Sequence, residues 1–190
     1  MAQDPLIQAR AEGIGILTAE QVRNLGALGP TARASGVDID VRRDHPHAAY
    51  DRVEWDVILE SKGDVFDKIM VRIREMFESV RIIRQCLSHL EHPSGPVDSR
   101  PKEVKPGEGI GHYEAPRGEV FHDIRSDGSN RPMRHKIRAP SYMNVPTNLE
   151  AVVGETIADA TIILAAVDPC YCCTERMAGV VDPQTEQVLI

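Results

Sequence analysis

The chain has 190 residues, of which 42% are hydrophobic and 27% are charged, and its formal net charge is -7. This length predicts one domain, or a large part of one, around a single core. The negative charge argues against nucleic acid or an anionic lipid surface as a direct partner. The longest apolar run, Ala160 to Val167, is far shorter than the roughly 20 residues that span a bilayer. No secretory signal is visible, so we expect an intracellular protein that reaches a membrane only through partners.

The first part of the chain predicts one short helix followed by a loop. Thr18 to Gln21 read Thr-Ala-Glu-Gln, a capping-box pattern, and Gly26 is suited to end the helix that this pattern begins. The next stretch, Gly29 to Arg42, is rich in Gly, Pro and Ser, and its charges alternate in sign. That composition predicts a solvated loop.

Asp64 to Leu90 predict one long amphipathic helix, because apolar residues recur there at intervals of three and four and Asp64 can cap the first turn. Charged residues, Lys68 and Arg72 among them, are expected on the solvent-facing side. Cys86, near the end of this helix, is expected to be a packed core or interface residue. The face that we expect to be buried consists of Phe66, Ile69, Ile73, Phe77 and Val80.

A loop, a hairpin and a second helical region follow. Glu91 to Gly111 carry several prolines and glycines and predict an extended loop. Gly118 to Ile124 and Met133 to Arg138 flank a turn and predict a β-hairpin. Thr147 to Ala166 are expected to be mainly helical, with a break near Gly154. The fold class that follows is α+β and mainly helical, with a long amphipathic helix and a β-hairpin.

Three of the four cysteines lie within four positions, in the stretch Asp-Pro-Cys-Tyr-Cys-Cys that begins at Asp168. Cys170 and Cys173 have the Cys-x-x-Cys spacing that lets two thiolates bind one metal or form a dithiol couple. Metal is the better of these two readings, because no alternation of strands and helices surrounds Cys170. Buried cysteines without a role remain an equally weighted alternative. A closed tetrahedral site needs four ligands, so a metal here would take its other ligands from elsewhere.

The stretch Asp168 to Arg176 resembles the C-terminal signature of nickel-iron hydrogenase large subunits, Asp-Pro-Cys-x-x-Cys-x-x-His, in the version ending in Arg that membrane-associated energy-converting hydrogenases carry. Three further segments agree with this resemblance in the same order. Gly29 to Gly36 read Gly-Pro-x-x-Arg-x-Ser-Gly, similar to a segment shared with the homologous large subunit of complex I. Ala115 to Gly118 read Ala-Pro-Arg-Gly, and Pro140 precedes a serine. The resemblance implies the C-terminal part of the hydrogenase large-subunit fold.

The resemblance also implies roles for individual residues. Cys170 would be the terminal nickel ligand and Cys173 the bridge between nickel and iron, in a nickel-iron centre whose iron carries carbon monoxide and cyanide. Arg117 would lie over the open side of that centre and supply a positive field and a hydrogen-bond donor. Pro140 and Ser141 belong to the segment that would hold a diatomic ligand of the iron. Cys172 occupies a variable position of the signature, so it is a doubtful ligand.

Two features depart from, or extend, the C-terminal signature. The family's other Cys-x-x-Cys is absent, since only Cys86 precedes Cys170, so half of the cysteine ligands would have to come from outside this chain. The 14 residues after Arg176 resemble the tail that an endopeptidase removes after nickel insertion, by cutting between Arg176 and Met177. We therefore expect residues 1–176 to be the hydrogenase part and residues 177–190 to be a propeptide-like tail.

The resemblance implies the C-terminal portion of the catalytic subunit of an energy-converting hydrogenase, which interconverts dihydrogen with protons and electrons. The implied partners are an iron-sulfur small subunit, the N-terminal part of the large subunit, membrane ion-translocating subunits, a maturation endopeptidase and, indirectly, ferredoxin. The implied location is the cytoplasmic face of the cell membrane. Two alternatives remain: a non-catalytic, complex I-like subunit fragment that helps to shape a quinone site, and a dithiol redox protein.

Overall fold

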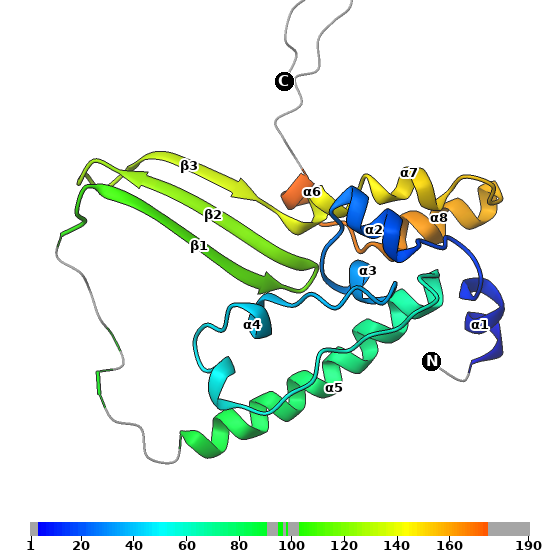
Figure 1. Cartoon of the computed structure of the whole chain (residues 1–190), viewed down its shortest axis with the longest axis horizontal. Coiled ribbons are helices and arrows are strands. Elements are labelled where there is room, and N and C mark those ends of the chain that lie inside the picture. Colours follow the sequence, from blue (N-terminus) through cyan, green and yellow to red (C-terminus); the bar gives the residue numbers. More distant parts are fainter. Residues whose placement is uncertain (1–3, 91–94, 97, 99–102, 175–190) are drawn as a thin grey trace, which may run out of the picture.

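The computed structural model describes residues 4–90, 95–96, 98 and 103–174. Helices surround one end of a small three-stranded antiparallel sheet, and a long helix runs beneath them (Figure 1). The described helical segments are α1 (Pro5–Ala11), α2 (Ala19–Leu25), α3 (Gly29–Arg33), α4 (Val41–Asp44), the 3-10 turn η1 (Tyr50–Arg52), α5 (Val65–His89), α6 (Pro140–Asn144), α7 (Thr147–Ala151), α8 (Ile157–Ala166) and α9 (Tyr171–Thr174). None of the helices in these residues is both long enough and apolar enough to cross a membrane.

The expected short helix is α2, and its two ends are those that the sequence indicates. The Thr18 hydroxyl accepts from the Gln21 N–H while the Gln21 side chain accepts from the Thr18 N–H, which completes the capping box. Gly26 ends the helix in the left-handed conformation, with φ of 66°. The loop expected from Gly29 to Arg42 is wrong, because this stretch folds into α3 and the start of α4 and is largely buried.

The expected hairpin is the β2–β3 pair, formed by β2 (Gly118–Ser126) and β3 (Pro132–Arg138). A further strand, β1 (Gly107–Ala115), pairs with β2 along its whole length. The prediction of an extended loop from Glu91 to Gly111 is therefore wrong from Gly107 onwards. Residues 91–94, 97 and 99–102 of the predicted loop lie outside the described residues. Only Pro116 and Arg117 separate the last paired residues of β1 and β2. The sheet thus presents Arg117 at the tip of a two-residue turn.

The long helix is confirmed as α5, but its buried face differs from the expected one. The Asp64 side chain caps the first turn by accepting from the Asp67 N–H. The fully buried positions are Val65, Asp67, Lys68 and Val71, while Phe66 and Ile69 pack partly buried against the core. Phe77 is 72% exposed and Val80 45% exposed, which contradicts the expectation for that half of the face. The expectation that Lys68 and Arg72 face solvent is also wrong.

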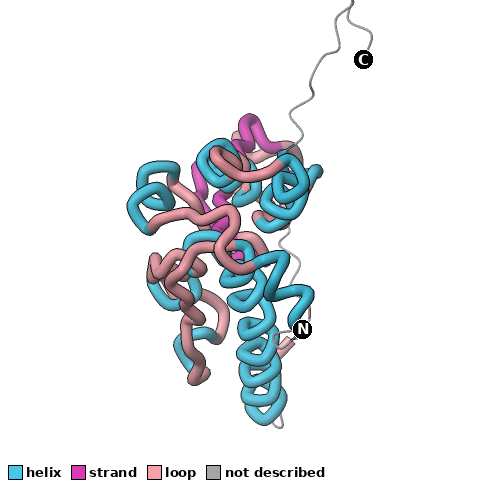
Figure 2. The backbone as a smooth tube through the Cα atoms, turned by 90° about the vertical axis from the view of Figure 1, so that its right-hand side faces the viewer, coloured by secondary structure: helices cyan, strands magenta, loops and turns pink. Residues whose placement is uncertain are grey.

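The packing around α5 explains this difference. Helix α5 contacts α1, α3 and α8, and its fully buried residues all lie between Val65 and Val71, in its N-terminal half. Its C-terminal half projects away from the other helices (Figures 1 and 2) and is flanked by the extended segment before it, through N–H groups of Glu54 and Asp56 that donate to Gln85 and Glu78. The core therefore lies at one end of α5. Its buried side chains come mainly from the first 71 residues and from α7 and α8: Ala11, Leu17, Val22, Ala27, Ala32, Val37, Val65, Ala151, Ile163 and Ala166.

Lys68 lies in this core, where its Nζ donates to the Gly15 carbonyl at 2.8 Å. Burial, partly offset by the charge of Asp64 and reinforced by that of Arg72, lowers the pKa of Lys68 to about 8 from its ordinary 10.5. The folded state therefore releases the Lys68 proton more readily than the unfolded state does. The cost of burying the ammonium is fully present below the folded pKa and disappears as pH rises past the unfolded pKa.

We expect the native chain to become more stable relative to Lys68→Met as pH rises. The difference between their unfolding free energies should increase by about 3 kcal/mol between about pH 7.5 and about pH 10.5. Urea unfolding of both proteins across this range is the measurement, and the subtraction removes the contributions of cysteines and tyrosines. A difference that stays flat with pH would mean that Lys68 is not desolvated in the folded state.

Candidate functional site

Arg117 connects the β1–β2 turn to the segment that leads into the cysteines. Its Nε donates to the Asp168 carbonyl oxygen at 2.5 Å, and its Nη2 donates to Asp168 Oδ1 at 3.2 Å. Asp168 can present both groups because its backbone is left-handed, with φ of 53°, an uncommon conformation for a residue other than glycine. The aspartate of the Asp-Pro-Cys stretch thus fixes the position of the guanidinium.

Ser141 makes the second connection to the cysteine segment. Pro140 starts α6, where its fixed φ suits the first helical turn, and both Pro140 and Ser141 are buried. The Cys170 N–H donates to Ser141 Oγ at 3.1 Å. Since Ser141 accepts in this bond, its own hydroxyl proton remains available to another acceptor.

Cys170 and Cys173 lie together in one turn at α9, where the Cys173 N–H donates to the Cys170 carbonyl at 2.9 Å. Hydrogen bonds from the Cys173 thiol and N–H, with the Arg117 charge, lower the pKa of Cys170. The same thiol-thiol hydrogen bond, reinforced by burial, raises the pKa of Cys173. Cys172 is exposed. The turn therefore makes Cys170 the more acidic thiol of the pair and Cys173 the less acidic one.

The structure brings Arg117, Ser141, Cys170 and Cys173 together, although 56 positions separate the first from the last of them in the sequence. This convergence was predicted from the motifs. In the described part of the chain, no group of three or more His, Cys, Asp or Glu side chains is placed to hold a metal ion. Two sulfur donors are the ligand type that soft metals prefer. The expected cleavage point, Arg176 and Met177, lies outside the described residues.

Asn144 and Gly29 support the Arg117 turn, and sequence reasoning assigned neither of them a role. The Asn144 side chain, almost completely buried, donates to the carbonyls of Arg117 and Leu28 at 3.0 and 3.2 Å and accepts from the Leu28 N–H at 2.8 Å. Gly29 has φ of 61°, and a Cβ there would lie 2.5 Å from the Arg117 carbonyl oxygen. The signals available in the sequence were a glycine that opens the Gly-Pro-x-x-Arg segment and an asparagine at the end of the Pro-Ser segment.

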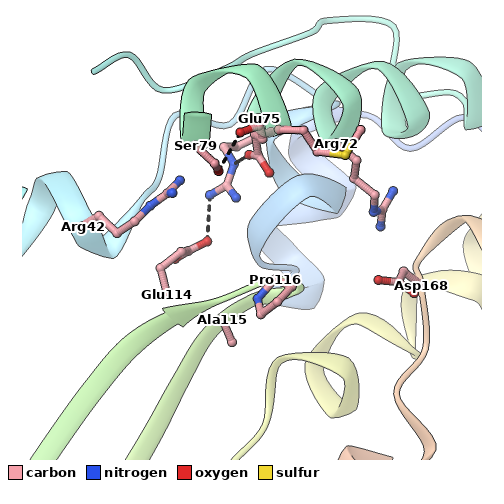
Figure 3. A pocket seen from close by; sticks show the side chains of 10 residues that line it. Arg42, Arg72, Glu75, Ser79, Glu114, Ala115, Pro116 and Asp168 are labelled. Atoms are coloured by element: carbon pink, nitrogen blue, oxygen red, sulfur yellow. Dashed lines mark hydrogen bonds and ion pairs between the residues drawn. The ribbon is translucent and has the colours of Figure 1, made fainter. Parts of the chain in front are cut away.

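Arg33, which the sequence did not place, lies at the centre of a buried ionic network. Its side chain is only 2% exposed, and its Nε and Nη1 contact Glu75 at 2.8 Å and Glu114 at 3.0 Å, with Asp40 at 3.3 Å. Burial raises the pKa of Glu114, an effect that the Arg33 charge opposes. The network forms one wall of a cavity that opens toward Asp168 (Figure 3).

Comparison with known proteins gives a family match over most of the chain. The family model described as respiratory-chain NADH dehydrogenase, 49 Kd subunit, matches residues 1–106 and 99–176. The carbon monoxide-induced hydrogenase of Rhodospirillum rubrum is 41% identical over 174 residues, which are 91% of this chain and 48% of that protein. An NADH-quinone oxidoreductase subunit of Dehalococcoides mccartyi is 39% identical over 171 residues, which are 88% of this chain and 46% of that protein.

A third relative, an F(420)H(2) dehydrogenase subunit of Methanosarcina mazei, is 38% identical over 176 residues, covering 88% of this chain and 46% of that protein. The chain thus spans about half the length of the curated relatives it matches. Their names describe a hydrogenase, an NADH-quinone oxidoreductase subunit and an F(420)H(2) dehydrogenase subunit. Since the matched segments together run from residue 1 to residue 176, the chain belongs to the family of the 49 kDa subunit of respiratory-chain NADH dehydrogenase.

Proposed function

We propose that this chain supplies the metal-binding C-terminal half of the large subunit of an energy-converting nickel-iron hydrogenase, which reversibly forms dihydrogen from protons and electrons. The observation that carries the proposal is the connection of Arg117 and Ser141 to the turn that holds Cys170 and Cys173. A guanidinium and a hydroxyl influence a metal centre only at short range, and the fold brings both to the cysteine segment.

In this proposal Cys170 and Cys173 hold a nickel-iron centre, with carbon monoxide and cyanide on its iron, and two further cysteines come from outside the chain. When bound, the centre supplies the chemistry of dihydrogen cleavage. The Cys170 sulfur, as a terminal thiolate, would be the group that takes up a proton. Arg117, held by Asp168, keeps a fixed positive charge beside the centre. The Ser141 hydroxyl proton, which the bond from Cys170 does not use, would be available to a diatomic ligand of the iron.

The proposed function implies that the chain works with partner proteins. Two of the relatives are named as subunits, and therefore as parts of larger enzymes. We propose an iron-sulfur small subunit, the N-terminal part of the large subunit, ion-translocating membrane subunits and a maturation endopeptidase as partners of this chain. Ferredoxin would be reached through the small subunit, and the assembly would be peripheral on the cytoplasmic face of the membrane.

A second candidate is a complex I-like scaffold without a metal. One observation favours it: several relatives are named NADH-quinone oxidoreductase subunits. In that reading Cys170 and Cys173 are packed thiols or a dithiol couple. The two candidates differ in one measurable property, which is the nickel content of the assembled protein.

We expect the isolated chain to bind no stoichiometric nickel, because two thiolates leave the metal pair short of ligands. Co-expressed with the complementary N-terminal part and maturation proteins, the chain should take up nickel and then lose residues 177–190. Metal analysis and intact-mass measurement of the purified complex test both steps. Cys170→Ser should abolish nickel uptake, while the matched control Cys172→Ser should retain it, because Cys172 is exposed and outside the Cys-x-x-Cys pair.

The possible results distinguish the hydrogenase, the scaffold and the dithiol. A nickel-free complex that contains all the partners would favour the scaffold. Active, nickel-containing enzyme that still carries residues 177–190 would sink the processing step alone. Tight stoichiometric nickel in the isolated chain would contradict the half-site, and a reversible thiol-disulfide titration of metal-free Cys170 and Cys173 would favour the dithiol.

A further inference from the structure

A cavity of about 380 Å³ lies beside the candidate site, between α5, the end of β1 and the segment before α9. Figure 3 shows Arg72 and Glu75 reaching into it from α5, with Glu114 and Pro116 below and Asp168 on the far side. Neither the family resemblance nor the proposed metal chemistry uses this space. Its volume lies within the range of small-molecule sites.

Arg72 is the residue on the cavity wall whose hydrogen bonds are incomplete. Its Nη1 donates to the Lys68 carbonyl at 2.8 Å, which anchors the side chain to the helix. Its Nε and Nη2 are shielded from solvent and have no hydrogen-bond partner among the residues that the structure describes. Buried donors without acceptors are rare in folded proteins because their lost hydration is costly, and a charged donor costs more than a neutral one.

The neighbouring carboxylates are already paired with other arginines. Asp168 accepts from Arg117, and Glu75 accepts from Arg33 at 2.8 Å. Burial lowers the pKa of Arg72, although the charges of Asp168 and Glu75 oppose this effect. An arginine cannot shed its proton to relieve such a position, so an acceptor supplied from outside would stabilise it.

Two neighbouring arginines show what the Nε and Nη2 edge of a guanidinium binds in this protein. Arg42 directs this edge at Asp40, with Nε to Oδ1 at 2.9 Å and Nη2 to Oδ2 at 2.5 Å. Arg117 directs the same edge at Asp168, where Nε donates to the backbone carbonyl oxygen at 2.5 Å and Nη2 donates to Oδ1 at 3.2 Å. In both cases the edge binds oxygens of one aspartate, and at Arg42 a single carboxylate takes both donors, which is the fork geometry that suits arginine best. The two unpartnered nitrogens of Arg72 form this same edge.

We propose that the cavity between α5 and Asp168 is a binding site for a small carboxylate, which Arg72 receives in bidentate fashion through its Nε and Nη2. The long Arg72 side chain turns this edge toward the cavity to receive the anion. Glu75 and Glu114 on the same wall are held by Arg33, so they do not face the ligand as free negative charges. Because the Arg72 guanidinium is largely shielded from solvent, its Coulomb attraction for the anion is screened less than at an exposed arginine.

The carboxylate has two possible sources with the same chemistry. It can be a free small anion such as formate or acetate, or an Asp or Glu side chain of a partner polypeptide. The inference does not depend on a metal, because it involves neither Cys170 nor Cys173. Its tests therefore need no nickel, and their failure leaves the proposed function untouched.

The test is thermal unfolding of the purified chain in sodium acetate or sodium formate, compared with sodium chloride at the same ionic strength. We expect the midpoint to rise by about 3–6 °C at roughly ten times the dissociation constant. The rise should vanish in Arg72→Met and fall strongly in Arg72→Lys, which keeps the charge but loses the fork. Arg84→Met is the matched control, since Arg84 is an exposed arginine of the same helix.

The Arg72 Nε–H resonance should shift on titration in the NMR spectrum, while that of Arg84 should not. If the response to acetate disappears once partner subunits are bound, the natural ligand is a carboxylate of a partner. If the response persists, the natural ligand is a free anion from solution. Both outcomes support the site. A midpoint that acetate does not raise above chloride overturns the proposal, as does an equal rise in the native chain and in Arg72→Lys.

Discussion

Arg33→Met is expected to lower the unfolding free energy by about 3–5 kcal/mol at neutral pH, since removal of one partner from a buried ion network leaves uncompensated charge behind. Arg33 contacts Glu75 and Glu114 directly, and its Nη1 also donates to the Ile39 carbonyl at 3.0 Å. Methionine keeps most of the volume of arginine, so the loss reports the charge rather than a cavity. Urea unfolding followed by circular dichroism is the measurement.

The dependence of this loss on pH identifies its origin. Burial already raises the pKa of Glu114 in the native chain, against the pull of Arg33. Without Arg33, the folded state holds the Glu114 proton still more firmly than the unfolded state does. A raised folded pKa of an acid gives stability that is present at low pH and lost as pH rises, so the deficit of Arg33→Met should be smaller near about pH 5 than near about pH 7.5.

Arg74→Met is the matched control for Arg33→Met. Arg74 lies on the same helix as Glu75 and pairs with Glu60 at 2.5 Å, but its side chain is 53% exposed. An exposed pair of this kind contributes at most about 1 kcal/mol. Equal losses in the two variants would show that the Arg33 network is hydrated and contributes no more than a surface pair.

Local signals predicted the parts of the fold that depend on neighbours in sequence. The capping box at Thr18 and the left-handed glycine at Gly26 define α2, and the N-cap at Asp64 begins α5. Turn residues between two alternating segments predicted the β2–β3 hairpin. These features involve hydrogen bonds between residues a few positions apart, which is why one sequence is enough to find them.

The wrong predictions concern features that tertiary packing determines. The interval pattern of α5 predicts that a face is buried, but it cannot say which half of the helix has neighbours, so Phe77 was expected inside and is exposed. Lys68 and Arg72 were expected to face solvent because their surroundings come from residues distant in sequence, such as Gly15, which accepts from Lys68, and Asp168, whose charge acts on Arg72. Glycine-rich composition similarly hid α3, whose burial comes from contacts with α5 and β2.

The candidate site was predictable for a different reason. Arg117, Ser141, Cys170 and Cys173 were found through motifs that resemble those of a known family, and no periodicity or spacing would have joined them. The supporting contacts are not predictable from these motifs, because Asn144 and Gly29 act through backbone atoms of the Arg117 turn. Residues that position a site through backbone contacts leave little chemical signature in a single sequence.

Gly29→Ala is expected to cost about 3 kcal/mol or more of unfolding free energy and to displace Arg117 from Asp168. The added Cβ would lie 2.5 Å from the Arg117 carbonyl oxygen and 2.6 Å from the Gly118 Cα, which are backbone atoms that no rotamer change can move. The left-handed φ of 61° adds a cost of roughly 1–2 kcal/mol for a residue with a Cβ. Relief of the contact requires the β1–β2 turn to shift, and the guanidinium shifts with it.

Gly13→Ala separates these two contributions. Gly13 is also left-handed, with φ of 74°, but a Cβ there meets no heavy atom within 4 Å. The control should therefore lose only the conformational cost, about 1–2 kcal/mol. The Arg117 Nε–H resonance, shifted by its bond to the Asp168 carbonyl, should change in Gly29→Ala and stay unchanged in Gly13→Ala. Equal losses in the two variants, with Arg117 unmoved in both, would show that the close approach of α3 to the β1–β2 turn does not hold the arginine in place.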